Sequence, residues 1–359
     1  MTKKKDKKKF KRKKIRLKNI NAAEIEEFEN EEFLENKQAD KRKIEKMKHT
    51  PKSDVELIKG RILEIRTNYK CLVDLDGQKK MCFLSGRLKQ LKLETKNIVS
   101  VGDYVNVDVA GKPRIEEILS RKNALVRFDE KGYQTEIVIA ANIDQVIITA
   151  SCKNPELKLG LVDRYICSAR ISEINPVICI NKIDLVDDLD IIKEKLEFYE
   201  KSRLEVIYTS AKENIGIDRL KALLKNKVSV FSGSSGTGKS TIINRLQPGL
   251  NLRVSKVSDY SNKGVHTTSE SKLVECCSFK GYLIDTPGIR TFGLSNEDKA
   301  KIKRVFPGFD KLYGKCKFSD CTHIHEKVCA VKEAVKKNNL PENRYNSYLR
   351  IYDSLDDKY

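Results

Sequence analysis

The hydrophobic and polar positions divide the chain into four stretches of different periodicity. Residues 1–52 hold few large apolar side chains, whereas 53–120 alternate apolar and polar positions in short runs, as half-buried β-strands do. Residues 121–295 alternate between continuous apolar runs and helical periodicity, which is typical of a parallel sheet covered by helices. Residues 296–359 hold a cysteine-rich segment followed by a helical pattern over 331–357. We therefore expect a polar tail followed by three folded domains.

The alternating stretch predicts a small β-barrel. Turn signals separate five short apolar runs, which fits a closed five-stranded barrel, and the OB-fold is the usual barrel of this size. Lysines and arginines interleave with the runs, so we expect the barrel to contact an RNA backbone, and only Tyr69, Phe83 and Tyr104 could stack on bases. The expected strands cover residues 56–65, 70–75, 80–84, 104–109 and 114–119.

The third stretch predicts a mixed α/β domain with a ligand site at one sheet edge. Several expected strands run directly into polar motifs. Because the carboxyl ends of parallel strands meet at the same edge of a sheet, these motifs should come together there. The expected strands include residues 142–150, 176–180, 206–209 and 282–284, with a further strand beginning at 228, and the expected helices include 161–171 and 189–202.

The strand that begins at Val228 leads into GSSGTGKS, a phosphate-binding loop of the form G-x-x-x-x-G-K-[ST]. Glycines let successive backbone N–H groups surround phosphate oxygens, and the helix that follows adds unpaired N–H groups at its first turn. Lys239 is expected to reach the β- and γ-phosphates and Ser240 to bind Mg²⁺. The nucleotide contacts expected from this loop come from Gly233, Ser234, Ser235, Gly236, Thr237, Gly238, Lys239, Ser240 and Thr241.

Two further motifs indicate that the base is guanine. The Asp184 carboxylate of the N-K-x-D motif can accept hydrogen bonds from N1–H and the 2-amino group of guanine, and a site with such polar partners rejects adenine strongly. Asn181 is expected to brace the loop, Lys182 to cover the ring, and the S-A-K motif at 210–212 to close the pocket with a backbone N–H toward the guanine oxygen. This pattern contradicts a P-loop kinase or ATPase. The expected guanine-binding residues are Asn181, Lys182, Ile183, Asp184, Ser210, Ala211 and Lys212.

The segment between the phosphate loop and the next strand end predicts the two switches of a GTPase. Asp285 begins a D-T-P-G motif and is expected to support Mg²⁺, and the Gly288 N–H is expected to sense the γ-phosphate. Either Thr267 or Thr268 should complete the Mg²⁺ coordination when GTP is bound. Such segments become ordered on the γ-phosphate and relax after hydrolysis.

The position after Gly288 departs from ordinary GTPases. Many of these enzymes carry a water-positioning glutamine there, whereas this chain has Ile289, whose aliphatic side chain cannot orient water. His266 in the first switch is therefore the candidate catalytic residue, and the alternative is an exposed switch residue without a catalytic role. Slow intrinsic turnover is expected in either case.

The motifs also stand in a permuted order. The guanine motifs precede the phosphate loop, and the D-T-P-G motif follows it. An ordinary GTPase sheet can be assembled from this order only if the chain is circularly permuted. The second switch then runs directly into the C-terminal region, so we expect the nucleotide state to be transmitted there.

The C-terminal region contains Cys316, Cys321, His323 and Cys329, which predict a structural zinc site. Three thiolates and an imidazole form a closed tetrahedral set with no position left for substrate. His325 is a second-ranked ligand, and isolated buried cysteines or a redox pair are the alternatives. Metal binding would fold a small domain that we expect to have little core of its own. Most of the other cysteines lie in apolar runs and are expected in the core.

The composition of the chain indicates its cellular compartment and the chemical class of its partner. The formal charge is +20, which indicates a polyanionic partner, and residues 1–20 hold twelve Lys or Arg against one acid. The tail is expected to be disordered in isolation; ordering on RNA and remaining solvated are equally favoured. No run of about 18 apolar residues and no secretory signal is present, so no membrane association is expected. Ten cysteines without disulfide-type spacing fit the cytoplasm.

With these motifs in place, residues 53–350 resemble the RsgA (YjeQ-type) family of small-ribosomal-subunit biogenesis GTPases. The likeness includes the barrel, the permuted order of N-K-x-D, S-A-K, G-x-x-x-x-G-K-S, G-x-H-T-T and D-T-P-G, and the Cys-Cys-His-Cys spacing. The resemblance implies a GTPase that binds the nearly mature 30S subunit and its 16S-type rRNA, assists late maturation and leaves on hydrolysis. It also implies that the subunit stimulates hydrolysis and that His266 acts in it. We expect the protein to be a monomer.

Two features lie outside this resemblance. Val265 stands where the family often has arginine before the switch histidine, and the basic tail of residues 1–52 is not explained. An alternative function is a nucleotide-regulated, RNA-binding placeholder for which hydrolysis is not essential.

Overall fold

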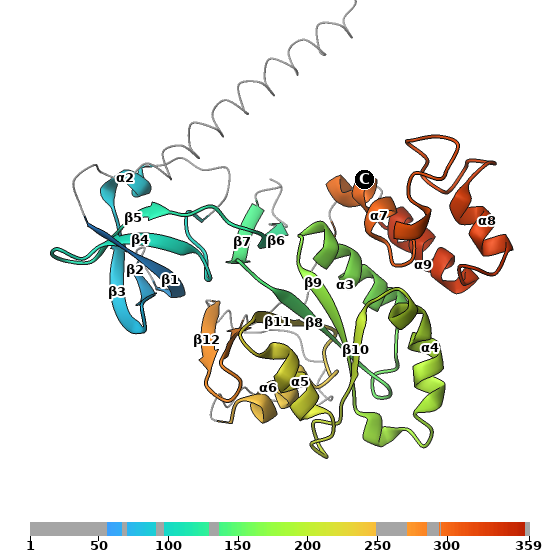
Figure 1. Cartoon of the computed structure of the whole chain (residues 1–359), viewed down its shortest axis with the longest axis horizontal. Coiled ribbons are helices and arrows are strands. Elements are labelled where there is room, and N and C mark those ends of the chain that lie inside the picture. Colours follow the sequence, from blue (N-terminus) through green and yellow to red (C-terminus); the bar gives the residue numbers. More distant parts are fainter. Residues whose placement is uncertain are drawn as a thin grey trace, which may run out of the picture. The chain divides into compact units, whose positions relative to one another are not determined.

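The fold is known from a computed structural model (Figure 1), which describes residues 56–66, 70–90, 97–128, 136–248, 271–285, 294 and 296–355. The basic tail and Tyr69 lie outside these ranges. Among the described helices, none combines the length and the apolar composition needed to cross a bilayer.

The N-terminal strands form the predicted OB-type barrel. The strand order is β1-β2-β3-β5-β4, and β4 pairs back with β1 in antiparallel register, which closes the barrel. Alternate side chains such as Cys71, Val73 and Leu75 are buried in its core. Its elements are β1 (Leu57–Arg66), β2 (Lys70–Leu75), β3 (Gln78–Leu84), α2 (Gly86–Lys89), β4 (Tyr104–Asp108) and β5 (Arg114–Ile118).

The following domain is built on a parallel sheet, as predicted. The strand order β10-β9-β8-β11-β13 is parallel throughout, and the antiparallel β12 (Lys272–Cys276) continues it to β1 of the barrel through the pair Glu64–Lys272. The sequence did not predict β12. The parallel strands are β8 (Gln145–Ser151), β9 (Asn175–Asn181), β10 (Glu205–Tyr208), β11 (Val228–Ser232) and β13 (Gly281–Asp285).

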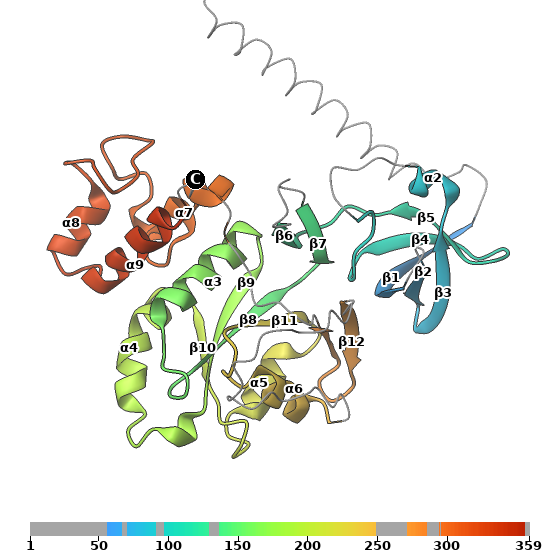
Figure 2. The same cartoon turned by 180° about the vertical axis from the view of Figure 1, so that it is seen from behind.

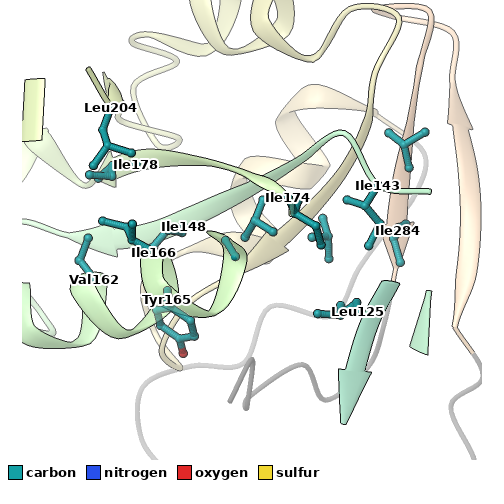
Figure 3. Close-up of a cluster of buried hydrophobic side chains, with 14 of the residues drawn as sticks. Leu125, Ile143, Ile148, Val162, Tyr165, Ile166, Ile174, Ile178, Leu204 and Ile284 are labelled. Carbon is teal, nitrogen blue, oxygen red and sulfur yellow. The ribbon is translucent and has the colours of Figure 1, made fainter. Parts of the chain in front are cut away.

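Helices cover both faces of this sheet because its strands are apolar on both sides (Figures 1 and 2). Ile148 and Ile178 pack on one face against α3 (Leu159–Ile171), as Figure 3 shows, and α4 (Asp190–Lys201) belongs to the same buried cluster. The neighbouring positions in each strand point the other way and pack against α5 (Ile217–Leu224) and α6 (Lys239–Leu246). The resulting three-layer arrangement confirms the predicted α/β fold.

A short hairpin, β6 (Ala124–Phe128) and β7 (Glu136–Ala141), connects the barrel to the sheet and was not predicted. The expected strand at 142–150 also begins later, at Gln145, because Asn142 has a left-handed backbone with φ of 55°. The Asn142 side chain stabilises this turn by accepting from the Lys122 N–H at 2.9 Å and donating to the Gly102 carbonyl at 3.0 Å.

The C-terminal region is helical, as predicted, and its helical pattern over 331–357 holds two helices. A left-handed Asn338 and Pro341 interrupt the pattern. The expectation that this region has little core of its own was wrong. Phe306, Phe309 and Tyr348 are at most 1% exposed, and their rings pack with centroids 4.8 to 5.5 Å apart. The elements are η3 (Asn296–Asp298), α7 (Lys299–Val305), η4 (Asp310–Leu312), α8 (Ala330–Lys336) and α9 (Glu342–Asp353).

The cysteines outside the predicted zinc set follow the expectation with one exception. Cys277 is exposed, whereas the other members are buried in apolar surroundings, which raises the pKa of the Cys71 and Cys179 thiols to about 12. The buried members are Cys71, Cys82, Cys152, Cys167, Cys179 and Cys276.

Candidate nucleotide site and metal centre

The predicted nucleotide motifs meet at the carboxyl edge of the parallel sheet. Asn181 is the last residue of β9, Ser232 the last of β11, and Asp285 the last of β13. The S-A-K motif follows β10 after a single residue, Thr209. Since β9, β11 and β13 all belong to one parallel sheet, the topology brings together motifs that lie far apart in the sequence.

Two glycines of the phosphate loop are required by close backbone approaches. Gly233 has φ of 145°, and a Cβ there would stand 2.1 Å from the Thr149 carbonyl oxygen. Gly238 has φ of 91°, and a Cβ there would stand 2.2 Å from Nδ2 of Asn181. Both positions therefore exclude any side chain, and the second one does so because the guanine motif packs directly on the loop.

The loop is held by its own side chains. Lys239 Nζ donates to the carbonyl oxygens of Gly233 at 2.8 Å and Ser234 at 2.7 Å, and Thr237 Oγ1 donates to the Ser234 carbonyl at 3.0 Å. The ammonium group of Lys239 is thus positioned across the loop whose N–H groups are expected to bind phosphate.

Asn181 joins three loops of the site. Its Nδ2 donates to the Thr237 carbonyl at 2.9 Å, and its Oδ1 accepts from the Ala211 N–H at 3.1 Å and from Thr209 Oγ1 at 3.2 Å. The side chain is only 2% exposed. Because the Ala211 N–H donates to Asn181 here, its contact with the guanine oxygen stays a prediction.

Asp184 lies in the single 3₁₀ turn η2 (Ile183–Leu185) and accepts a hydrogen bond from Ser210 Oγ at 2.5 Å. The preceding Lys182 has a left-handed backbone with φ of 64°, and its Nζ donates to the Asn154 carbonyl. Partial burial lowers the pKa of Lys182, although the nearby Asp184 carboxylate acts in the opposite direction. The two guanine motifs are therefore linked side chain to side chain.

Arg245 on α6 is a site residue that the sequence analysis missed. Its Nε donates to the Ala211 carbonyl at 3.0 Å and its Nη2 to the Lys212 carbonyl at 3.2 Å. The helix after the phosphate loop thereby holds the S-A-K loop in place. No motif marks Arg245, because its role depends on the packing of α6 beside a loop that precedes it by about 30 residues.

The switch residues cannot be placed in the same way. His266, Thr267, Thr268, Gly288 and Ile289 lie outside the described residues, and Asp285 is described only through its backbone, which pairs with Lys272. Their roles in Mg²⁺ binding and hydrolysis stay predictions.

The predicted zinc ligands converge on one point. The ligand atoms of Cys316, Cys321, His323 and Cys329 all lie within 4.8 Å of one another, and His325 is not a member of this group. The His323 Nδ1 lies 3.5, 3.4 and 3.4 Å from the three sulfur atoms, and two of the sulfurs are 3.9 Å apart. Bond lengths of about 2.3 Å to sulfur and 2.0 Å to nitrogen give tetrahedral edges of about 3.5 to 3.8 Å, so the group fits zinc.

Surrounding hydrogen bonds hold the ligand loop in shape. Glu326 accepts from the N–H and hydroxyl of Thr322 at 2.6 and 2.9 Å and from the Ile324 N–H at 3.0 Å. Partial burial alone would raise the pKa of Glu326, but these hydrogen bonds lower it to about 2. Tyr345 and Tyr348 donate their hydroxyls to the carbonyls of His323 and Thr322 at 2.7 and 2.6 Å. The helix α9 thus supports the metal loop.

Comparison with known proteins identifies the family. A small ribosomal subunit biogenesis GTPase, RsgA 2 of Bacteroides thetaiotaomicron, is 35% identical over 305 residues, which are 84% of this chain and 97% of that protein. The chain belongs to the RsgA GTPase family. The RsgA of Flavobacterium psychrophilum is 35% identical over 79% of this chain and 89% of its own, and the family profile for RsgA GTPase matches residues 118–295.

Two solved structures share the fold. YjeQ from Thermotoga maritima superposes with a TM-score of 0.67 at 32% identity, over 85% of this chain and all of that chain. The circularly permuted GTPase YloQ gives the same TM-score at 24% identity. The predicted permuted GTPase fold is therefore confirmed, and as an RsgA GTPase the chain is a GTP-hydrolysing enzyme.

Proposed function

We propose that this chain acts in the cytoplasm on the small (30S) ribosomal subunit, binds its 16S-type rRNA, hydrolyses GTP there and leaves when hydrolysis is complete. The relatives named above carry the name of a small ribosomal subunit biogenesis GTPase. The net charge of +20 suits an rRNA partner. The main support for the proposal is that Asn181 links the guanine motifs to the phosphate loop by hydrogen bonds to Ala211 and Thr237, in a chain of the RsgA family.

Within this proposal each site residue has a distinct role. Asp184 selects guanine, Asn181 and Arg245 keep the base loops fixed on the phosphate loop, and Lys239 neutralises phosphate charge. Ser240, with Thr267 or Thr268, would hold Mg²⁺, which supplies further charge neutralisation. The Cys316–Cys329 cluster would hold one structural Zn²⁺. His266 would position the attacking water, a role that Ile289 cannot take.

The C-terminal region would report the nucleotide state. It is tied to the GTPase domain through a buried ion pair, Asp163 Oδ2 to Arg344 Nη1 at 2.8 Å, and through Arg170, which donates to the Val305 carbonyl at 2.9 Å. Because α3 carries both Asp163 and Arg170, it is the element that connects the sheet to the zinc-bearing region.

The test is co-sedimentation of the protein with 30S subunits in the presence of GTP, GDP or a non-hydrolysable GTP analogue. We expect binding with the analogue, weak binding with GDP, and trapping of His266→Ala on the subunit in GTP. Equal binding in all nucleotide states would contradict the proposal.

The second candidate is a placeholder in which nucleotide binds but hydrolysis is not essential, and Ile289 favours it. A His266→Ala protein that hydrolyses no GTP on the subunit yet leaves it as fast as the unmodified protein would support the placeholder and exclude release by hydrolysis.

A further inference from the structure

A pocket lined by charged and polar side chains lies at the opposite edge of the parallel sheet from the nucleotide motifs. Its volume is about 410 Å³, which is within the range of roughly 300 to 1,000 Å³ found for ligand sites. Val228 is the first residue of β11 and Ser232, at the phosphate loop, is the last, so the two sites are about 13 Å apart along the strand. Its lining residues are Arg61, Tyr104, Lys122, Asn142, Asp144, Asn226, Val228, Lys280 and Tyr282.

The pocket is predominantly cationic. Arg61, Lys122 and Lys280 line it together with a single carboxylate, Asp144. Asp144 Oδ2 already accepts from the Val228 N–H at 2.9 Å, and its pair with Lys122 is long, at 3.9 Å, and solvent-exposed. Exposed pairs of this kind contribute little, so the Lys122 ammonium remains available to another anion. In the described part of the chain, neither Arg61 nor Lys280 has a carboxylate within ion-pair distance.

Arg61 is fixed in place as a preorganised donor. Its guanidinium carbon lies 5.0 and 5.3 Å from the ring centroids of Tyr104 and Tyr282, and its Nη2 donates to the Asn142 carbonyl at 3.1 Å. Its Nε is buried and has no hydrogen-bond partner among the described atoms. A planar guanidinium held beside aromatic rings is suited to phosphate oxygens.

We propose that this pocket binds a backbone phosphate of RNA through Arg61, Lys122 and Lys280. The tyrosine and asparagine side chains around it are further donors of the kinds that contact phosphates in nucleic-acid complexes. The rings of Tyr104 and Tyr282 already pack on Arg61, so the pocket recognises phosphate and does not read a base. The site is separate from the GTP site, and it deepens the proposed function, on which the choice of RNA rests.

The test compares Lys122→Gln/Lys280→Gln with a control, Lys193→Gln/Lys195→Gln on α4, which removes the same charge. All four lysines are solvent-exposed, so neither protein should lose its fold. Binding to purified 30S subunits and to a single-stranded RNA 20-mer is measured at several salt concentrations, with GTP affinity as the check on the nucleotide site.

We expect the pocket variant to bind both RNAs more weakly and its plot of log affinity against log salt to be flatter by about 0.7 to 0.9, which is the change for one lost phosphate contact. The control and all GTP affinities should be unchanged. A pocket variant that binds like the control overturns the pocket proposal.

Two further results separate the alternatives. If the unmodified protein fails to bind 30S subunits, the proposed function fails, and the 20-mer alone decides the pocket. If inorganic phosphate at constant ionic strength raises the unfolding temperature of the unmodified protein but not of the pocket variant, while both bind RNA equally, the pocket holds a free anion and the RNA assignment is wrong.

Discussion

Asp184 is the residue on which base selection depends. We predict that Asp184→Asn lowers GTP affinity by roughly 100-fold, because a charged acceptor of two hydrogen bonds becomes a neutral one. Xanthine carries a carbonyl oxygen where guanine carries the 2-amino group, so the asparagine amide should gain affinity for XTP. Binding of both nucleotides is measured by calorimetry, with the exposed Asp187→Asn as control. Unchanged GTP affinity would show that Asp184 does not contact the base.

Glu326 is a second single residue whose substitution tests the account, here for the loop that carries the predicted zinc ligands. Its charged form is the one that the fold stabilises, so its contribution is complete above the ordinary glutamate pKa and falls as the pH approaches about 2. We predict that Glu326→Gln lowers zinc affinity about 10-fold at pH 7, as expected for a group that orients a ligand loop. The control is Glu333→Gln, an exposed residue on α8. Equal zinc affinity in the two variants would contradict this role.

At the scale of elements, helices and strands with regular apolar spacing were predicted well. Strands that depend on partners far along the chain were missed. The barrel strands and the helices α3 and α4 lie within a few residues of their expected bounds because their apolar spacing is regular. The β6–β7 hairpin and β12 were missed, since their pairing depends on partners far along the chain. The C-terminal core was underestimated because Phe306 and Phe309 are separated from Tyr348 by the metal loop.

The contact between α3 and α9 gives an element-scale prediction. Asp163 is fully buried and Arg344 is 6% exposed, and Tyr199 on α4 donates to the Asp163 carboxylate at 2.6 Å. We predict that Arg344→Met alone lowers the free energy of unfolding by about 3 to 5 kcal/mol, because it leaves a buried carboxylate without its cation. The double variant Asp163→Leu/Arg344→Met should recover most of this loss.

Urea unfolding measures both variants, with the exposed Arg350→Met on α9 as the control. If the single and double variants were equally unstable, the ion pair would not be what holds α9 to α3, and shape complementarity between the helices would be the better explanation.

At the scale of the whole molecule, the order of the motifs was the main basis for predicting a circularly permuted GTPase fold. A chain in which guanine motifs precede the phosphate loop can form a GTPase sheet only by permutation, and the strand order β10-β9-β8-β11-β13 shows that sheet. The sequence could not reveal Arg245 or the Arg61 pocket, because each depends on elements that only folding brings together. The connections of α3 to the zinc-bearing region likewise follow from packing and have no sequence signature.

The central claim is that this chain is a GTPase triggered by the small ribosomal subunit. The most direct measurement is GTP turnover by the purified protein, alone and with 30S subunits, at low and high salt. We predict slow turnover alone and strong stimulation by the subunit, weakened by salt because phosphate contacts dominate RNA binding. Tight GTP binding without any stimulation would contradict the claim.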